Sequence, residues 1–460
     1  MAWKDLRLFL EKLEEMGDLV RIKDPFSTRY EIVGLTRQAA DADGPALLFE
    51  NVKESEFPVL SNLYGAKRRI ALALGVPEEE LFRYYLEHEE DYVEPRIVDE
   101  GPCQEIVLTG DEIDLRKLPI LLHYEKDGGP YITAGIQIAK HPDTGQRNLS
   151  IHRLLLLDKD LVTVYAPPGR HLGRIIQRNE DFGRGTPIAT AIGVDPVIGV
   201  ASQARVPMGH DEFAVAGGLG REPVELVRCK TIPVEVPAYT EIVLEGETIP
   251  GERVPDGPFG EYPGTYSPVK QAPVMRIKAV TMRRRAIYQN ALTGMPMTEN
   301  HWMMQPAATA MVYREAHKVC PEVKAVNVTP GGTCRHHVIV SIKKRHAYEA
   351  RNLMLALMAG PLGAKHVVVV DEDIDVFNML QVEWAINTRV QPDKDVIVVP
   401  EMYSPTLDPS APIERATAKM GIDATAPLGK LQDFQPPKVP GIEKLDLSKY
   451  WSPAGRGGRP

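Results

Sequence analysis

The stretch "YITAGIQIAKHPDTGQRNLSIHRLLLLDKDLVTVYAP", residues 131–167, indicates the architecture of the middle of the chain. Apolar runs of strand length alternate in it with short polar turns such as "HPDTGQ" (141–146), which is typical of an antiparallel meander. So many strands in succession favour a barrel or a curled sheet between residues 111 and 310. Further strands are predicted over 231–238, 240–247 and 274–284, and helices over 171–183 and 210–219.

The regions on either side have the alternating helix and strand pattern of α/β units. Residues 1–110 begin with an amphipathic helix that stops at Gly17. Its apolar face carries Trp3, Leu6, Phe9, Leu10 and Leu13. Between residues 311 and 450, near-continuous Val and Ile runs bounded by helices predict a buried, largely parallel sheet. The expected fold class is therefore α/β with three domains, 1–110, 111–310 and 311–450, followed by a flexible tail, 451–460.

Composition indicates a globular protein that does not bind nucleic acid as its main partner. The chain has 460 residues, 43% hydrophobic and 25% charged, and a net charge of −9. Phosphate backbones require a basic surface, which this balance does not supply. No apolar stretch approaches the roughly 18 residues of a membrane span. The N-terminus lacks signal-peptide features and the four scattered cysteines form no CxxC pair. We therefore expect a cytoplasmic protein without a membrane span.

A second stretch, "VPDGPFGEYPGTY" (254–266), places Asp256 and Glu261 five positions apart around a turn. Gly257, Pro258 and Gly260 favour a tightly specified turn conformation. Two acids on a surface turn are commonplace. The pair therefore has chemical meaning only if the rest of the chain supplies a partner for both carboxylates.

Three other segments carry residues able to bind a metal ion or a phosphate. Asn148 in "NLSIHR" (148–153) offers an amide oxygen, His171 an imidazole, and Glu212 a carboxylate. This mixed set suits Mn²⁺ or Mg²⁺. Arg170 and the helix start that follows it favour a phosphate. Each segment alone has an ordinary alternative, namely a half-buried strand, a helix start with solvated arginines, and an acidic helix N-terminus.

Taken together and in this order, the motifs resemble those of the UbiD family of reversible decarboxylases, which use prenylated FMN. The similar segments are "NLSIHR", "PPGRH", Glu212, "DGPFGE" and "VVDEDIDVFNMLQVEWAINTR" (369–389). The resemblance extends from about residue 5 to residue 425. It implies an N-terminal α/β unit, a central split β-barrel that holds the flavin, and a C-terminal α/β unit used in oligomerisation. It also implies a homodimer or a homohexamer, with a flavin prenyltransferase as the source of the cofactor.

The resemblance assigns roles position by position. Asn148, His171 and Glu212 would hold Mn²⁺ (or Mg²⁺) that bridges to the cofactor phosphate, and K⁺ would bind near the backbone of Ala201 and Ser202. Arg153, Asp256 and Glu261 match the Arg–acid–acid triad of the family, with Asp256 where some members have Glu. His152 has no implied role. The residues that would line the cofactor are Thr133, Ser150, Ile151, Arg153, Arg170, His171 and Ser202.

The triad fits the chemistry of decarboxylation. Loss of CO₂ from an sp² carbon leaves a carbanion that no side chain can delocalise, so a cofactor must accept the electrons while the protein orients and protonates. We hypothesise that Glu261 is the proton donor, that Arg153 is its electrostatic partner, and that Asp256 holds Arg153. Burial and a second carboxylate raise the pKa of such a donor, whereas an arginine lowers it.

The substrate is expected to be an aromatic, heteroaromatic or α,β-unsaturated carboxylic acid. The segment "TGMPMTENHWMMQ" (293–305) predicts a flat apolar slot, unless its Met and Trp side chains belong to the core. The candidate lining residues are Tyr262, Met297, Asn300, His301 and Trp302. Two other functions are considered. A flavin-dependent oxidoreductase on a split-barrel fold would need no such triad, and a non-catalytic assembly subunit would not need a competent residue at every triad and metal position.

Overall fold

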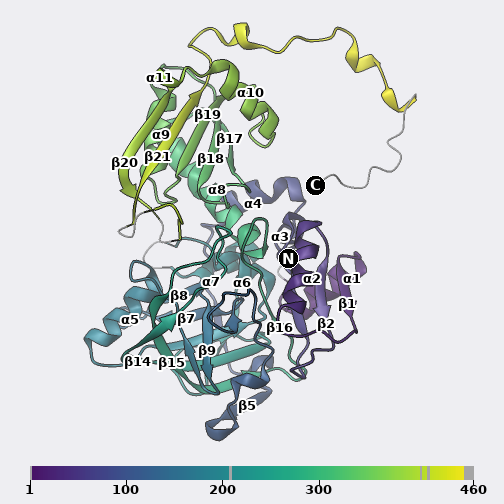
Figure 1. Cartoon of the computed structure of the whole chain (residues 1–460). Helices are drawn as coiled ribbons and strands as arrows, with labels where there is room; N and C mark the ends of the chain where they lie inside the picture. The colour runs from purple at the N-terminus through teal and green to yellow at the C-terminus, as the bar shows by residue number, and fades with distance from the viewer. Residues whose placement is uncertain (1–2, 207–209, 405–406, 412–414, 450–460) are drawn as a thin grey trace.

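The computed structural model describes residues 3–206, 210–404, 407–411 and 415–449. An N-terminal α/β unit lies beside a large central sheet, at the right of Figure 1, and the long helix α8 leads up into a second α/β unit, the C-terminal one. This arrangement confirms the expected mixed α/β, multidomain fold class with a curled central sheet. The tail expected over residues 451–460 lies outside the described residues.

The N-terminal unit packs helices on a four-stranded sheet with the order β1-β2-β3-β16. As expected, α1 buries an apolar face, and Gly17 follows it with a φ of 71°. Strand β16 (Tyr288–Gln289) comes from beyond the central sheet and pairs in parallel with β3. The other elements are α1 (Leu6–Glu15), β1 (Leu19–Ile22), α2 (Glu31–Asp41), β2 (Ala46–Phe49), β3 (Val59–Ser61), α3 (Lys67–Ala73) and α4 (Leu81–His88).

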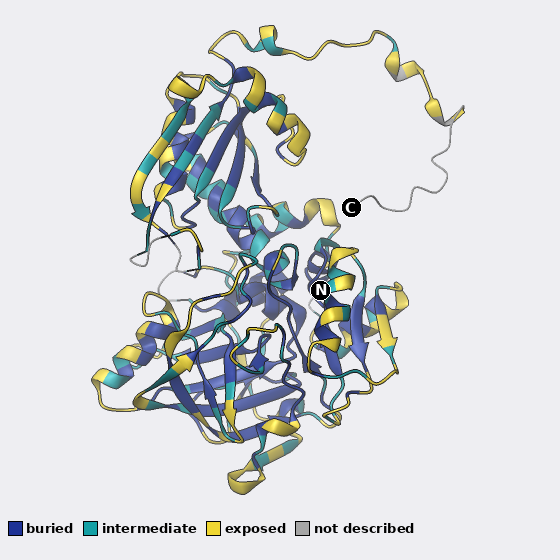
Figure 2. Ribbon diagram, viewed as in Figure 1, coloured by how far each residue is buried: buried dark blue, intermediate teal, exposed yellow. Residues whose placement is uncertain are grey.

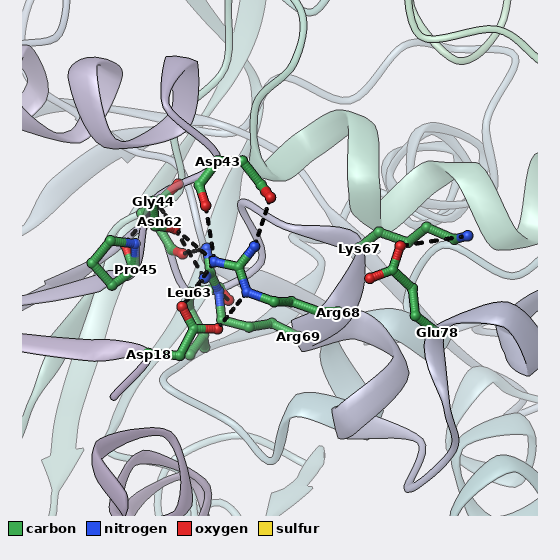
Figure 3. Close-up of polar contacts among 10 residues, drawn as sticks. All are labelled: Asp18, Asp43, Gly44, Pro45, Asn62, Leu63, Lys67, Arg68, Arg69 and Glu78. Atoms are coloured by element: carbon green, nitrogen blue, oxygen red, sulfur yellow. Dashed lines mark hydrogen bonds and ion pairs between the residues drawn. The ribbon is translucent and has the colours of Figure 1, made fainter. Parts of the chain in front are cut away.

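A buried arginine on α3 ties this unit together (Figure 3). Arg69 is 1% exposed and donates hydrogen bonds to the carbonyl oxygens of Leu63 and Asn62, both at 2.9 Å. It also donates to Asp18 at 2.8 Å, and the neighbouring Arg68 binds the same carboxylate at 2.8 and 2.9 Å. A guanidinium can be buried here because these oxygens replace its lost water.

The central sheet has nine strands in the order β6-β9-β10-β15-β14-β11-β7-β8, with β5 paired to β15. Its strands are β5 (Ile106–Thr109), β6 (Tyr131–Ile132), β7 (Ile136–Lys140), β8 (Arg147–Ile151), β9 (Leu154–Asp158), β10 (Leu161–Thr163), β11 (Pro187–Ile192), β14 (Ile242–Asp256) and β15 (Lys270–Met282). A separate small sheet contains β4 (Arg96–Val98), β12 (Glu225–Arg228) and β13 (Glu235–Pro237), and the helices are α5 (His171–Asp181), α6 (Pro196–Ala201) and α7 (Glu212–Gly220).

The connection from β8 to β9 explains why the sheet curls. Only His152 and Arg153 separate the two strands, yet β8 and β9 lie near opposite ends of the strand order. Two residues can connect them only if the ends of the sheet approach each other. The expected single meander is therefore wrong at this point. β7–β8 and β9–β10 are antiparallel hairpins, and β8 does not pair with β9. Because β8 ends at Ile151, Arg153 lies in the short connection between the two hairpins and not on a strand.

The C-terminal unit contains a five-stranded sheet with the order β17-β18-β19-β21-β20. Its β18–β19 and β19–β21 pairs are parallel, whereas β17–β18 and β20–β21 are antiparallel. The expectation of a largely parallel sheet is thus wrong, because apolar runs report burial on both faces and not strand direction. The elements are α8 (Glu299–Val319), β17 (Val323–Val328), β18 (His337–Ile342), α9 (Glu349–Ala359), β19 (His366–Asp371), α10 (Met379–Arg389), α11 (Pro392–Asp395), β20 (Val396–Tyr403) and β21 (Ala416–Ala424).

Burial follows this layering. Figure 2 shows buried residues through the central sheet and the inner strands of the C-terminal sheet, whereas β20 and the segment after β21 are largely exposed. Among the helices of the described ranges, none combines the length and the apolar character needed to cross a bilayer.

Candidate active site

One cavity of about 590 Å³ brings together most of the residues singled out in the sequence. Its wall is formed by the central sheet, the loops that follow its strands, the first turns of α8, and loops of the C-terminal unit. Such a volume is in the usual range for sites that bind small molecules and cofactors. The sequence-predicted residues on the wall are Thr133, Asn148, Ser150, Ile151, Arg153, Arg170, His171, Ser202, Glu212, Glu261, Tyr262 and Asn300.

Arg153 is the common partner of the two acids on the 254–266 segment. Its Nε and Nη2 donate to Asp256 Oδ1 at 2.9 and 2.7 Å, and its Nη1 pairs with Glu261 Oε1. Arg153 and Asp256 are 6% and 0% exposed, whereas Glu261 is on the cavity wall. The fold therefore places both acids around one buried guanidinium, with Glu261 facing the space where a ligand would bind.

Neighbouring side chains hold this arginine and its acid in place. Thr163 on β10 donates from Oγ1 to Asp256 Oδ2, so both oxygens of that carboxylate are engaged. The guanidinium carbon of Arg153 lies 4.3 Å from the ring centroid of Tyr165 and 5.1 Å from that of Phe259, which are cation–π distances. Sequence reasoning missed Thr163 because it is on a different strand and no local pattern marks it.

The turn between the two acids is fixed by the segment that precedes β6. Gly257 donates its N–H to Tyr131 Oη at 2.9 Å, and Gly260 donates to Asp127 Oδ1 at 3.0 Å. Gly257 has a φ of 104°, and a Cβ on Gly260 would lie 2.3 Å from the ring of Tyr124. Both positions therefore require glycine, the first for its backbone angle and the second for close packing.

Burial determines the acidity of Glu261. It raises the pKa of this carboxyl above its ordinary value, while Arg153 opposes the rise and the charge of Asp256 adds to it. A carboxyl with a raised pKa keeps its proton at higher pH and can act as a general acid near neutrality. The arrangement can thus hold a proton beside the cavity and stabilise the anion left after its transfer.

The three predicted metal ligands lie on the same wall. Asn148 Nδ2 donates to Glu212 Oε1 at 3.1 Å, and the backbone N–H of Leu149 donates to Glu212 Oε2 at 2.8 Å. Burial raises the pKa of Glu212 to about 8, and a divalent cation would supply the counter-charge that this carboxylate needs. Burial, then Arg174, lowers the pKa of His171 at the start of α5, which favours the neutral imidazole that metals bind. The donor set fits Mn²⁺ or Mg²⁺.

Two of the other predicted cofactor contacts, Thr133 and Ser202, carry hydroxyl groups that are already hydrogen-bonded. Thr133 Oγ1 donates to Asn290 Oδ1 at 2.9 Å, and Ser202 Oγ donates to the carbonyl oxygen of Gly199 at 2.7 Å. Their protons are thus directed into the protein. His152, for which no role was expected, also lines the cavity. Burial, then Arg170, lowers its pKa to about 4, so its imidazole is neutral.

Two of the five residues expected around the substrate lie on the cavity wall. Tyr262 and Asn300 line the cavity, but among its described lining residues Met297, His301 and Trp302 do not occur. His301 is buried, and its Nδ1 bonds to Thr298 at 2.8 and 3.1 Å. Its Nε2 lies 2.7 Å from the carbonyl oxygen of Tyr262. His301 therefore supports the backbone next to Glu261, and its ring nitrogens are already engaged.

Several cavity residues were not anticipated from the sequence. Three are arginines, Arg205, Arg335 and Arg415, and Arg335 lies in a "CRHHV" motif that draws attention to its histidines. The apolar part of the wall includes Phe259, Met304, Met311 and Leu362. These positions come from distant segments that only the tertiary fold brings together.

Comparison with known families identifies the class to which this fold and site belong. Residues 10–88, 96–296 and 301–424 match the N-terminal, Rift-related and C-terminal domains of 3-octaprenyl-4-hydroxybenzoate carboxy-lyase, UbiD. The protein is therefore a carboxy-lyase. The chain belongs to the UbiD family, which confirms the resemblance seen in its motifs.

Individual relatives agree with this placement over nearly the whole chain. An anhydromevalonate phosphate decarboxylase from Methanothermobacter thermautotrophicus is 38% identical over 431 residues, which is 94% of this chain and 99% of the relative. The UbiD-class enzyme HmfF from Pelotomaculum thermopropionicum, solved with FMN, is 40% identical with a TM-score of 0.90, covering 97% of this chain and 100% of HmfF. An evolved dimeric form of HmfF, solved with prenylated FMN (prFMN), is 39% identical with a TM-score of 0.87 and the same coverage. These likenesses support the enzyme over the oxidoreductase and assembly-subunit alternatives.

Proposed function

We propose that this carboxy-lyase uses prenylated FMN to remove CO₂ reversibly from an unsaturated carboxylic acid, with Glu261 as the proton donor. The observation that carries the proposal is the pairing of Arg153 with both Asp256 and Glu261 at the cavity wall. Glu261 is paired with a buried arginine that a second carboxylate holds in place. Its carboxyl group can therefore exchange one proton with a bound carbon centre in fixed geometry.

The cavity supports prenylated FMN as the cofactor, since HmfF holds FMN or prFMN in the same fold. When bound, this group supplies the electron sink that decarboxylation requires. Asn148, His171 and Glu212 would hold Mn²⁺ or Mg²⁺, with K⁺ near the backbone of Ala201 and Ser202. Thr133, Ser150, Ile151, Arg153, Arg170, His171 and Ser202 would line the cofactor.

The chain's own residues then carry the proton. Glu261 in its acid form delivers a proton to the carbon that has lost CO₂, and Arg153 stabilises the carboxylate that remains. Asp256, held by Thr163, keeps the guanidinium in position and offsets part of its charge. Apolar side chains of the wall, such as Phe259 and Met304, exclude water that would compete as a proton source.

The first substrate to test is anhydromevalonate phosphate, the compound named for the 38% identical relative. It combines a carboxylate with a phosphate, and the cavity wall combines apolar side chains with arginines. Aromatic and heteroaromatic acids form the second group of candidates. Tyr262 and Asn300 are the wall residues proposed to contact the acid near Glu261.

The proton donor is tested by Glu261→Gln in protein co-produced with a flavin prenyltransferase. Glutamine keeps the shape and the cofactor but has no proton to deliver, so kcat should fall about 100- to 10,000-fold. Turnover is followed as CO₂ release, and the cofactor is identified by its spectrum and intact mass. The control is Glu252→Gln, at an exposed acid on strand β14, which should keep full activity. Full activity of Glu261→Gln, or plain FMN in the active wild type, would contradict the proposal.

We further propose a homo-oligomer, either a dimer or a hexamer, formed through the C-terminal unit. Phe377, Leu380 and Val398 of this unit are 66%, 77% and 63% exposed, and burying such side chains stabilises an interface. The evolved HmfF is described as dimeric, which supports assembly as a property of related chains. Light scattering on the cofactor-loaded protein distinguishes the two sizes from a monomer.

A further inference from the structure

Four arginines line the cavity and form no ion pair with an acid of the described residues. Arg170 and Arg205 come from loops of the central unit, and Arg335 and Arg415 from the C-terminal unit. Within residues 3–206, 210–404, 407–411 and 415–449, no carboxylate forms an ion pair with any of them. Arg205 Nη1 donates to the carbonyl oxygen of Pro361, and Arg335 Nε is buried with no hydrogen-bond partner among these residues.

The arginines are close enough to repel one another. Burial, followed by the charge of Arg335, lowers the pKa of Arg170. Burial, followed by Arg335 and Arg170, lowers the pKa of Arg205 to about 10. Burial lowers the pKa of His336, the neighbour of Arg335, and the charge of Asp408 opposes this change. The Asp408 carboxylate is already bound by Lys365 at 2.8 and 3.0 Å. A cluster of like charges that has no acidic ion-pair partner in the described part of the chain, in a protein of net charge −9, indicates a site for an anionic ligand.

Arg335 also lies close to the segment that carries the proton donor. Arg170 directly precedes the proposed metal ligand His171, so we expect Arg170 to lie beside the phosphate of the cofactor. The charge of Arg335, and less strongly that of Arg170, opposes the rise that burial causes in the pKa of Tyr262, the residue after the proton donor. His336, next to Arg335, stacks on Tyr262 with an interplanar angle of 10° and lies 3.3 Å from its hydroxyl oxygen. Because the reacting carbon must lie within reach of Glu261, this is the substrate side.

Resting on the decarboxylase function proposed above, we propose that Arg335, together with Arg205, binds a phosphate group carried by the substrate. Forked N–H groups of two guanidiniums match the charge and the oxygen spacing of a phosphate dianion. The two arginines come from different units, so a substrate that binds both would also draw the C-terminal unit onto the central sheet. An acid without a phosphate would leave both charges without a counter-ion and should bind more weakly.

The test compares two substrates in cofactor-loaded wild type and Arg335→Gln. We would measure kcat and KM with anhydromevalonate phosphate and with the same acid lacking its phosphate, and quantify the released flavin. Arg335→Gln should raise KM for the phosphorylated acid roughly 10- to 100-fold, the effect of losing one charge-assisted hydrogen bond. KM for the other acid and the flavin content should not change. The KM of Arg335→Lys for the phosphorylated acid should lie between those of the wild type and Arg335→Gln. Arg351→Gln, an exposed arginine on α9, is the matched control.

Other outcomes would overturn the assignment. An equal rise in KM for both acids would show a structural role for Arg335, and loss of flavin would assign it to the cofactor phosphate. If the wild type turns over neither acid, anhydromevalonate phosphate is not the substrate, and that part of the proposed function fails separately. Titration of the flavin-loaded protein with inorganic phosphate then decides the inference: binding that Arg335→Gln abolishes supports it, and binding that is absent or unchanged in the variant overturns it.

Discussion

Glu261 is the residue whose protonation should set the pH dependence of the reaction. Burial raises its pKa above the ordinary value of roughly 4.3 for glutamate, although Arg153 opposes this rise. The donor must carry its proton when it reacts, and a raised pKa keeps that proton to higher pH. We therefore expect kcat to fall as pH increases through the raised pKa, which a profile of kcat against pH on the loaded enzyme would show.

Asp256 should affect the pH at which kcat falls. Asp256→Asn removes a negative charge near Glu261 and leaves Arg153 to pair with Glu261 alone, and both changes lower the pKa of Glu261. The falling limb of the kcat profile should therefore move to lower pH. Asp158→Asn, at an exposed acid on β9, should leave it in place. A limb at unchanged or higher pH in Asp256→Asn would show that Asp256 does not act on the donor.

Thr163 should matter for catalysis although it does not line the cavity among the described lining residues. Thr163→Val removes the hydrogen bond to Asp256 and the acceptor for the Leu155 N–H, so Arg153 loses part of its support. We expect kcat to fall roughly tenfold with the flavin content unchanged. Thr281→Val is the matched control, because that hydroxyl is buried on β15 without a hydrogen-bond partner among the described residues. Equal activity of the two variants would contradict this support role.

Among the elements, α8 depends on one buried carboxylate at its first turn. Glu299 is 0% exposed and accepts the backbone N–H groups of Asn62, Tyr64 and Leu292 at 3.1, 3.2 and 2.9 Å. These groups come from the N-terminal unit and from the end of the central unit. One side chain therefore joins both to the helix that leads into the C-terminal unit.

Glu299→Ala should lower the free energy of unfolding by about 3 kcal/mol, since three buried N–H groups would lose their acceptor. Glu299→Gln keeps one acceptor oxygen and should cost less. Urea unfolding followed by circular dichroism measures both. Glu315→Ala, further along α8 and paired with Lys318, should change stability by less than about 0.5 kcal/mol. A loss no larger in Glu299→Ala than in this control would contradict the role of Glu299.

The helices and strands were easier to predict from the sequence than the way the strands pair in the sheets. The amphipathic pattern of α1 and the apolar runs of β18 and β19 each indicated the right element, because periodicity and burial are local properties. The antiparallel neighbours β17 and β20 were not anticipated, since strand direction depends on the path of the chain. The two-residue break between β8 and β9 was likewise not anticipated, because no glycine or proline turn marks it in the sequence.

At the scale of the whole molecule, the cavity exists because two units meet. The central sheet contributes Arg153, Asn148 and Glu261, and the C-terminal unit contributes Arg335. No pattern in the sequence predicts that His336, the neighbour of Arg335, contacts Tyr262, because the two residues are 74 positions apart and lie on different units. The arginines of the cavity could therefore be recognised as a group only in three dimensions.

The sequence by itself determined the class of this protein and indicated its candidate reactive groups. The triad Arg153, Asp256 and Glu261 and the ligand set Asn148, His171 and Glu212 follow motifs whose residue types the chemistry requires. The tertiary structure decided which of the candidates share a cavity. It gave His301 a structural role, added Thr163 behind Asp256, and collected arginines from separate units. The reason is physical: residue type sets what a group can do, whereas its partners, burial and pKa depend on distances that only folding creates.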